Sequence, residues 1–190
     1  MGLSNFLGWL FSSRPPAPAL AHDALASPTA AVVSTVTPNR RAFLDMIAYS
    51  ELGTALLALS ADGYNVIVGS TPEHLDLFTS YADHPRKLIQ LRPGLASTAA
   101  GRYQILEGTF DDYKAKLHLD DFSPASQDSI ALQMIRETGA LPLIDMGDIK
   151  DAMAKVAHLW ASLPGAGYGQ HENQLVDLQA AYTKAGGTLA

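Results

Sequence analysis

Residues 39–53 read NRRAFLDMIAYSELG, and their pattern predicts the first helix of the folded part of the chain. The pair Thr37-Pro38 just before them suits an N-cap residue followed by proline in the first helical turn. Phe43, Ile47 and Glu51 recur at i, i+4 and i+8, so they share one face of this helix. The glycine that closes the stretch suits a helix end. An acidic residue is therefore expected on a helical face that is otherwise apolar.

The carboxyl group of Glu51 has two features that favour its protonated form near neutral pH. Burial on an apolar face disfavours the anion, and the negative end of the helix dipole opposes a further negative charge. Both effects raise a carboxyl pKa, as is required of a general acid that protonates the leaving oxygen of a glycosidic bond. The spacing alone also fits a boundary glutamate that makes only a local hydrogen bond.

A second stretch, residues 97–104, reads STAAGRYQ and offers groups that suit a sugar. Gly101 lets a backbone or a ligand approach closely. Tyr103 and Gln104 supply a ring, a hydroxyl and an amide, which match the acetamido group of an N-acetylated sugar. The alternative is a helix start capped by the serine or threonine at the head of the stretch.

Composition excludes several other classes of function. The 190 residues include 13 Lys and Arg against 19 Asp and Glu, and the net charge of −6 argues against a nucleic-acid partner. The absence of cysteine removes disulfides and thiol chemistry. The six histidines form no H-x-x-x-H pair, so neither a metal nor another cofactor is expected. The segment GAGYGQ at 165–170 lacks the strand of a dinucleotide site, and no G-x-S-x-G motif supports a serine triad.

Residues 1–38 differ in composition from the rest and predict a disordered extension rich in Pro, Ala and Ser. The folded domain is expected to span residues 39–190. The apolar hexamer FLGWLF at 6–11 suggests a weak membrane contact, a short signal-peptide core or simply a sticky end. No run of 18 apolar residues occurs, so no membrane-spanning helix is expected.

The remaining pattern predicts an α+β domain with most of its mass in helices. Residues 62–71 read DGYNVIVGST and predict a strand, with a second short strand near 77–81 and a connector at 83–91. From about residue 98 onward the patterns are helical. Three later helices are expected: one that begins at Ser123-Pro124, one that begins at Asp148, and a last one that carries Leu175, Leu178 and Tyr182.

Taken together, these stretches resemble the lambda-type phage endolysins, which are soluble lytic transglycosylases of the lysozyme superfamily. The similarity runs from about residue 41 to residue 187 and does not cover residues 1–38. The segments that carry it are RAFLDMIAYSE, GYNVIVGS, FTSYADHPRKLIQLRPGLASTAAGRYQIL, DFSPASQDSIALQMI, GALPLID and WASLPGAGYGQ.

The resemblance implies a lysozyme-like fold, in which a mainly helical lobe and a small β-hairpin lobe flank a glycan-binding cleft. The catalytic glutamate of the family follows a serine at the end of the first domain helix, which corresponds to Ser50 and Glu51. The side chains of Tyr103 and Gln104 are then expected to hold the sugar in the cleft, and Ser50 is expected to bind substrate by a hydrogen bond near the glycosidic centre. One departure is local: Leu52 intervenes before the glycine that directly follows Ser-Glu in other members, which puts the geometry of this loop in question.

The activity implied is cleavage of the β-1,4 bond between N-acetylmuramic acid and N-acetylglucosamine, with Glu51 first as acid and then as base. The product would be a 1,6-anhydro-muramoyl sugar. Tyr81, Asp83 and Tyr168 are further candidates for the cleft lining. The alternatives are a hydrolytic muramidase, in which Asp62 or Asp83 positions water, and a non-catalytic module that binds the cell wall.

The same resemblance implies where the protein acts and what it binds. Peptidoglycan glycan strands are the expected partner, and a monomer is expected. A phage endolysin of this kind would wait in the host cytoplasm until a holin releases it to the periplasm. The N-terminal extension leaves a membrane-tethered or an exported form open.

Overall fold

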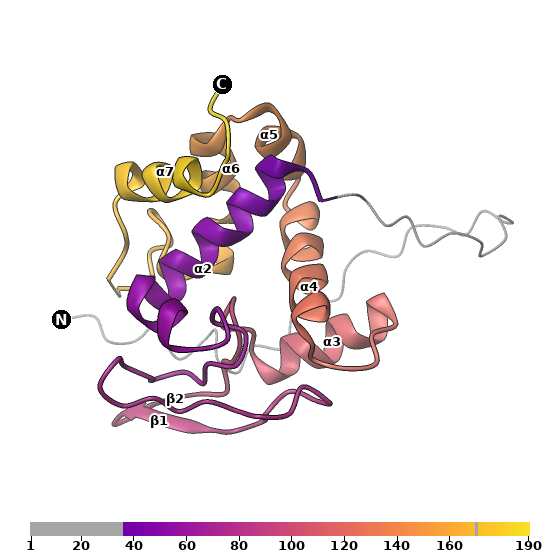
Figure 1. Ribbon diagram of the computed structural model, residues 1–190, viewed down its shortest axis with the longest axis vertical. Coiled ribbons are helices and arrows are strands. Elements are labelled where there is room, and N and C mark those ends of the chain that lie inside the picture. Colours follow the sequence, from indigo (N-terminus) through magenta and orange to yellow (C-terminus); the bar gives the residue numbers. More distant parts are fainter. Residues whose placement is uncertain (1–35, 170) are drawn as a thin grey trace, which may run out of the picture. The chain divides into compact units, whose positions relative to one another are not determined.

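Residues 36–169 and 171–190 are described in the computed structural model of the protein (Figure 1). Residues 37–190 form one compact unit. The predictions for the N-terminal extension, including the apolar hexamer at 6–11, lie outside the described residues except at positions 36–38.

The first helix of this unit, α2 (Pro38–Leu59), begins as the sequence predicts. The Thr37 side chain accepts a hydrogen bond from the backbone N–H of Arg40 and caps the helix. The prediction that the helix ends at Gly53 is only partly right. Gly53 has φ 71° and ψ 163°, which breaks the helix, but a second helical segment follows at once and continues to Leu59. The kink arises because only glycine adopts this positive φ without strain.

The part of α2 before the kink runs through the middle of the domain (Figure 1). By length and mean hydropathy, α2 could cross a membrane. Its apolar side chains are instead the centre of the protein core, which explains the same composition. Buried along it are Ala42, Phe43, Leu44, Met46, Ile47, Ala48, Ser50 and Leu56.

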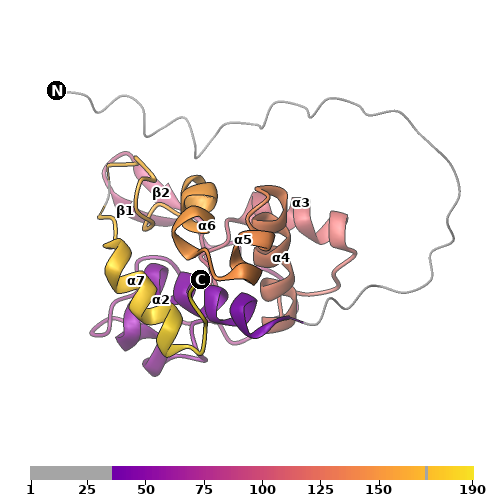
Figure 2. The ribbon, with the colours of Figure 1, turned by 90° about the horizontal axis from the view of Figure 1, so that it is seen from above.

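The described residues form five further helices and one 3₁₀ turn, of which α7, α5 and α4 pack directly against α2. Figure 2 shows α7 alongside α2. Their bounds are α3 (Glu107–Leu117), α4 (Pro124–Glu137), α5 (Leu141–Met146), α6 (Ile149–Val156), η1 (Ala157–Leu159) and α7 (Leu175–Lys184). The predicted starts at Ser123 and Asp148 are confirmed, because each side chain accepts a hydrogen bond from a backbone N–H of the first turn. The α3 and α5 helices were not predicted individually.

The sheet consists of the antiparallel strands β1 (Ile89–Arg92) and β2 (Leu95–Ser97), in which Ile89 pairs with Ser97. The predicted strands at 62–71 and 77–81 are wrong, and part of the predicted connector is β1. Val66 and Ile67 are both buried, so the segment does not have one inner and one outer face. It makes single bridges to two different segments, at Leu77 and Ala100, instead of a continuous ladder.

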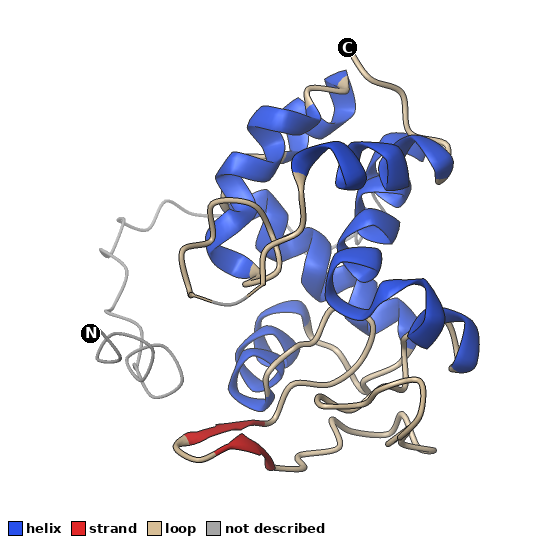
Figure 3. Cartoon of the chain, turned by 90° about the vertical axis from the view of Figure 1, so that its left-hand side faces the viewer, coloured by secondary structure: helices blue, strands red, loops and turns tan. Residues whose placement is uncertain are grey.

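The described domain is thus α+β, as predicted, with the helices gathered on one side and the hairpin on the other (Figure 3). The kink of α2 lies where the helical part meets the loops that lead to the hairpin (Figure 1). The residues around Gly53 therefore lie at the boundary between the two parts of the domain.

Candidate active site

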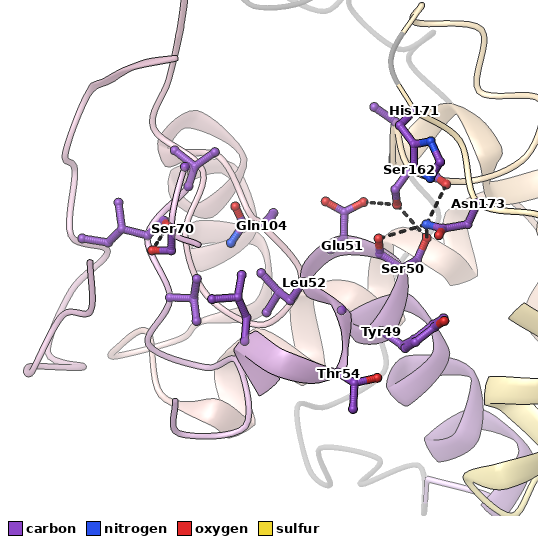
Figure 4. A pocket seen from close by; sticks show the side chains of 17 residues that line it. Tyr49, Ser50, Glu51, Leu52, Thr54, Ser70, Gln104, Ser162, His171 and Asn173 are labelled. Atoms are coloured by element: carbon purple, nitrogen blue, oxygen red, sulfur yellow. Dashed lines mark hydrogen bonds between the residues drawn. The ribbon is translucent and has the colours of Figure 1, made fainter. Parts of the chain in front are cut away.

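A pocket of about 570 Å³ opens at the kink of α2 (Figure 4). Three parts of the chain and one further side chain, Gln104, line it. The parts are the end of the first segment of α2 with the start of the second, the loop at 66–70, and residues from the two ends of the segment between η1 and α7, at 161–162 and 171–173. The lining residues are Tyr49, Ser50, Glu51, Leu52, Gly53, Thr54, Leu56, Val66, Ile67, Val68, Gly69, Ser70, Gln104, Ala161, Ser162, His171 and Asn173.

Glu51 projects into this pocket from the last turn before the kink. Burial raises the pKa of its carboxyl from an ordinary value of 4.5 to about 7, while a side-chain and a backbone hydrogen bond from Ser162 act in the opposite direction. The direction agrees with the effect of burial expected from the sequence. A carboxyl group with this pKa exchanges a proton readily near neutral pH, which suits a general acid.

The neighbours of Glu51 on its inner side are uncharged hydrogen-bonding groups. The Ser162 hydroxyl donates to Glu51 Oε1 over 2.5 Å, and the Oγ atoms of Ser50 and Ser162 lie 2.7 Å apart. The amide nitrogen of Asn173 lies 3.0 Å from Ser50 Oγ, 3.1 Å from Ser50 O and 3.3 Å from Ser162 O. Ser50 is only 8% exposed. Its hydroxyl belongs to this cluster, and the contact predicted between Ser50 and the glycan stays a prediction.

Gln104 lines the pocket opposite Glu51, as Figure 4 shows. Its Nε2 donates to the Gly101 carbonyl oxygen over 2.9 Å, which folds the side chain back over the turn 101–104. A Cβ atom on Gly101 would lie 2.1 Å from Gln127 Oε1. That oxygen accepts a hydrogen bond from the Arg102 backbone N–H over 2.9 Å. The close approach predicted at Gly101 therefore occurs, and the group that approaches is a buried side chain of α4.

Tyr103 lies in the core and does not line this pocket. Its side chain is 1% exposed, and its hydroxyl donates to Asp128 Oδ1 over 2.6 Å. Its carbonyl oxygen accepts from Trp160 Nε1 over 3.0 Å. Burial is the largest cause that raises the pKa of this phenol well above its usual value. These contacts hold the turn that presents Gln104.

The other predicted lining residues also lie outside this pocket. Tyr81 packs edge-on against Phe78, with ring centroids 5.3 Å apart. The Tyr168 hydroxyl donates to the His158 carbonyl oxygen over 2.9 Å. Asp83 forms an ion pair with Arg86 at 2.8 Å. Their contact with substrate stays a prediction.

The loop that carries Asn173 is fixed by a carboxylate. Glu172 accepts hydrogen bonds from the backbone N–H groups of Gly165 and Gly167, each over 2.8 Å. These bonds lower the pKa of Glu172. The Asn173 backbone N–H donates to Ser162 O over 2.8 Å, which ties the end of the loop to the segment after η1.

Ser162 and Asn173 were not singled out from the sequence. Each lies more than a hundred residues from the α2 residue it contacts. Ser162 belongs to the segment WASLPGAGYGQ that carries the resemblance, but no role was predicted for it. Within residues 36–169 and 171–190, no group of three or more His, Asp or Glu residues could hold a metal ion.

A family model described as endolysin matches residues 41–189. The chain belongs to the endolysin family. The endolysin of Escherichia phage lambda is 53% identical over 156 residues, which cover 81% of this chain and 95% of that protein. The endolysin of Escherichia phage P2 is 47% identical over 159 residues, which cover 80% and 95%.

Solved structures of the bacteriophage lambda lysozyme share the fold of this endolysin. One, a complex with a chitohexasaccharide, matches with a TM-score of 0.75 and 52% identity over 81% of this chain and 97% of that chain. A second structure of the same lysozyme matches with a TM-score of 0.72 and 52% identity. The predicted family and the lysozyme-like fold are confirmed. As an endolysin with a lysozyme fold, the protein is a glycosidase that degrades peptidoglycan and causes lysis.

Proposed function

We propose that this endolysin is a lytic transglycosylase that cleaves the β-1,4 bond between N-acetylmuramic acid and N-acetylglucosamine. One observation carries the proposal: Glu51 is the only carboxylate among the described residues that line the pocket. A glycosidase that activates water normally uses a pair of carboxyl groups about 5–9.5 Å apart. The two acidic residues considered as partners are engaged elsewhere, since Asp62 pairs with Arg102 and Asp83 with Arg86.

In the first step Glu51 acts as the acid. Its proton passes to the oxygen that links the two sugars, and the bond from C1 of the muramoyl residue to that oxygen breaks. The positive charge that develops at C1 is stabilised by the acetamido group of the same sugar, so no second carboxylate is required. Glu51 is left as an anion, which the hydroxyl of Ser162 stabilises.

In the second step Glu51 acts as the base. It takes the proton from the 6-hydroxyl of the muramoyl residue, and that oxygen forms a bond to C1. The product is a 1,6-anhydro sugar, no water is consumed, and Glu51 is protonated again. A pKa of about 7 suits both steps, because the proton is neither too tightly nor too weakly held near neutral pH.

Binding of the glycan is assigned to Gln104 on one side of Glu51 and to Ser50 on the other. Gln104 offers an amide to the acetamido group of a sugar, and Tyr103 holds the turn that presents Gln104. The structure of the lambda lysozyme with a chitohexasaccharide supports a substrate of this kind, because that ligand is a chain of N-acetylated sugars. Tyr81, Asp83 and Tyr168 are proposed to contact parts of the glycan outside the pocket.

Digestion of peptidoglycan in water enriched in ¹⁸O tests the reaction type. A transglycosylase yields anhydro-muramoyl ends that contain no label and are lighter by one water than reducing ends. Reducing ends that carry one ¹⁸O would identify a hydrolytic muramidase and contradict the proposal. Unchanged glycan chains would point to a module that only binds the wall.

In the cell, this activity fits an enzyme that waits in the host cytoplasm and reaches the periplasm when a holin opens the inner membrane. We assign it to residues 39–190. The extension at 1–38 is proposed to act as a tether or an export segment.

A further inference from the structure

A row of four hydrogen-bonding groups runs from Asn173 to Glu51 behind the pocket (Figure 4). Its members are Asn173 Nδ2, Ser50 Oγ, Ser162 Oγ and Glu51 Oε1, in that order. Three elements far apart in the sequence contribute: α2, the segment after η1, and the loop before α7. None of the four groups carries a fixed charge.

The chemistry of these groups fixes which atom donates each hydrogen bond in the row. The carbonyl oxygens of Ser50 and Ser162 can only accept hydrogen bonds, so the nitrogen of the Asn173 amide must face them. That nitrogen cannot accept a hydrogen, so the Ser50 hydroxyl does not donate to it. Ser162 donates its one hydroxyl hydrogen to Glu51 Oε1, so Ser162 Oγ accepts the hydrogen of the Ser50 hydroxyl.

We infer that Ser162, oriented by Ser50 and Asn173, is a positioning residue that assigns separate tasks to the two oxygens of Glu51. Oε1 accepts the Ser162 hydrogen bond, and Oε2 carries the proton that is given to the glycan. This inference rests on the proposed role of Glu51 as the acid. In Figure 4 the oxygen that is not bonded to Ser162 points toward the side of the pocket where Gln104 lies.

The assignment has a consequence for both proton transfers. A donor on Oε1 prevents the carboxyl group from placing its proton on the buried side, where it cannot reach the glycan. After the transfer, the same donor stabilises the anion and keeps Oε2 open to the 6-hydroxyl. Replacing the hydroxyl would make Glu51 a weaker acid with a higher pKa, since the hydrogen bond from Ser162 lowers this pKa.

Other titratable groups line the pocket or lie on the segments that carry Gln104 and Asn173. Tyr49 and His171 are the other titratable side chains among the described residues that line the pocket. The turn that carries Gln104 also carries Arg102, which is paired with Asp45 and Asp62. The loop that carries Asn173 also carries Glu172, which is bound to two backbone N–H groups. The pKa of Glu51 responds to burial and to Ser162.

The test compares pH profiles of kcat on soluble peptidoglycan fragments for the full chain and its variants. Ser162→Ala removes the hydroxyl and keeps the backbone N–H. Its alkaline limb should move up by about one pH unit, and kcat on the plateau should fall about tenfold. Ser162→Thr restores a hydroxyl and should return both values toward those of the unchanged protein. Ser129→Ala is the matched control, because Ser129 is an exposed serine that donates only to Ala125 O in its own helix.

Ser50→Ala gives a second route if Ser162→Ala does not fold. It removes the donor to Ser162 and should move the alkaline limb in the same direction by a smaller amount. A lower kcat with an unmoved alkaline limb in both variants, while Glu51→Gln is inactive, overturns the inference alone. Cleavage by Glu51→Gln at near-normal rate instead overturns the proposed function.

Discussion

Glu51 and Glu137 are two glutamates of the same domain with opposite pKa shifts. Each accepts a hydrogen bond from a hydroxyl group, Glu51 from Ser162 at 2.5 Å and Glu137 from Tyr113 at 2.7 Å. Glu137 also pairs with Lys116 and accepts from Gln133 Nε2, and its pKa is lowered. Glu51 forms no ion pair with another described residue, and burial raises its pKa to about 7.

The difference shows what makes one of these carboxyl groups an acid. Burial alone acts in the same direction on both. Hydrogen bonds from Lys116, Gln133 and Tyr113 together stabilise the Glu137 anion enough to reverse that effect. Only the hydroxyl and the backbone N–H of Ser162 act in this direction on Glu51. Glu51 can release and recover a proton near neutral pH, because it has no ion pair with a described residue that would stabilise its anion.

The largest effect is expected from changing the two glutamates to glutamine. Glu51→Gln removes the proton donor and should reduce glycan cleavage by about a thousandfold. Glu137→Gln, the matched control, should retain activity close to that of the unchanged protein. The measurement is the rate of release of soluble muramoyl fragments from purified peptidoglycan. Comparable losses in both variants would remove the distinction between the two sites.

The pH profile of activity is the next test of the comparison. Glu51 must be protonated to act as an acid, so kcat should decline above about pH 7 and fall roughly tenfold for each further unit. Glu137 is already ionised at lower pH and should leave no inflection near 7. A profile that stays flat to pH 9 would be incompatible with a Glu51 pKa of about 7.

Protein stability should depend on pH in opposite ways at the two sites. The pKa of Glu51 is about 7 in the folded state, above its unfolded value of 4.5, so the folded state binds the proton more tightly. The stability that this binding contributes is fully present below pH 4.5 and is lost as the pH rises through about 7. Glu51→Gln should therefore gain about 1–3 kcal/mol relative to the unchanged protein between pH 5 and pH 8.

Glu137 should show the reverse trend. Its folded pKa is lowered, so its ion pair contributes stability above the unfolded pKa and loses it as pH falls through the folded pKa. Glu137→Gln should cost less than about 1 kcal/mol at pH 7, because the pair with Lys116 is partly exposed. Urea unfolding at a series of pH values measures both differences. Parallel curves for the two variants would disprove the opposed trends.

The smallest effect is expected when the cation beside Glu137 is removed. Lys116→Met should raise the pKa of Glu137 only slightly, because Lys116 is half-exposed and solvent screens the pair. The side-chain carboxyl signal of Glu137, followed by NMR titration, reports the change. An unchanged pKa would mean that Tyr113 and Gln133 account for the lowering.

The sequence predicted those features that depend on neighbouring residues. The N-caps at Thr37, Ser123 and Asp148 involve groups within three or four positions, so their helices were found. Glu51 was found because its position on an apolar helical face is also a local property. The strand at 62–71 was misplaced, because alternation cannot distinguish a segment enclosed on both sides from one with a single buried face.

The partners of Glu51 could not be predicted in the same way. Ser162 lies 111 positions away and Asn173 lies 123 positions from Ser50, and both are common polar residues in loops. Their role depends on how α7 and the segment after η1 pack around α2, which no local pattern contains. Tyr103 was predicted in the cleft because its hydroxyl suggested a ligand contact, but that hydroxyl donates to the half-buried carboxylate of Asp128 instead.

The break at Gly53 divides α2 into two segments with different surroundings. Before it, most residues of α2 are buried in the core, so the packing of that helix fixes the position of the acid. After it, Thr54, Ala55, Ala58 and Leu59 are exposed, and the helical phase begins anew. Leu52 fits beside Gly63, where a Cβ atom would lie only 2.6 Å from the Leu52 side chain. Changes of sequence or length in the exposed segment after Gly53 should therefore leave the acid in place.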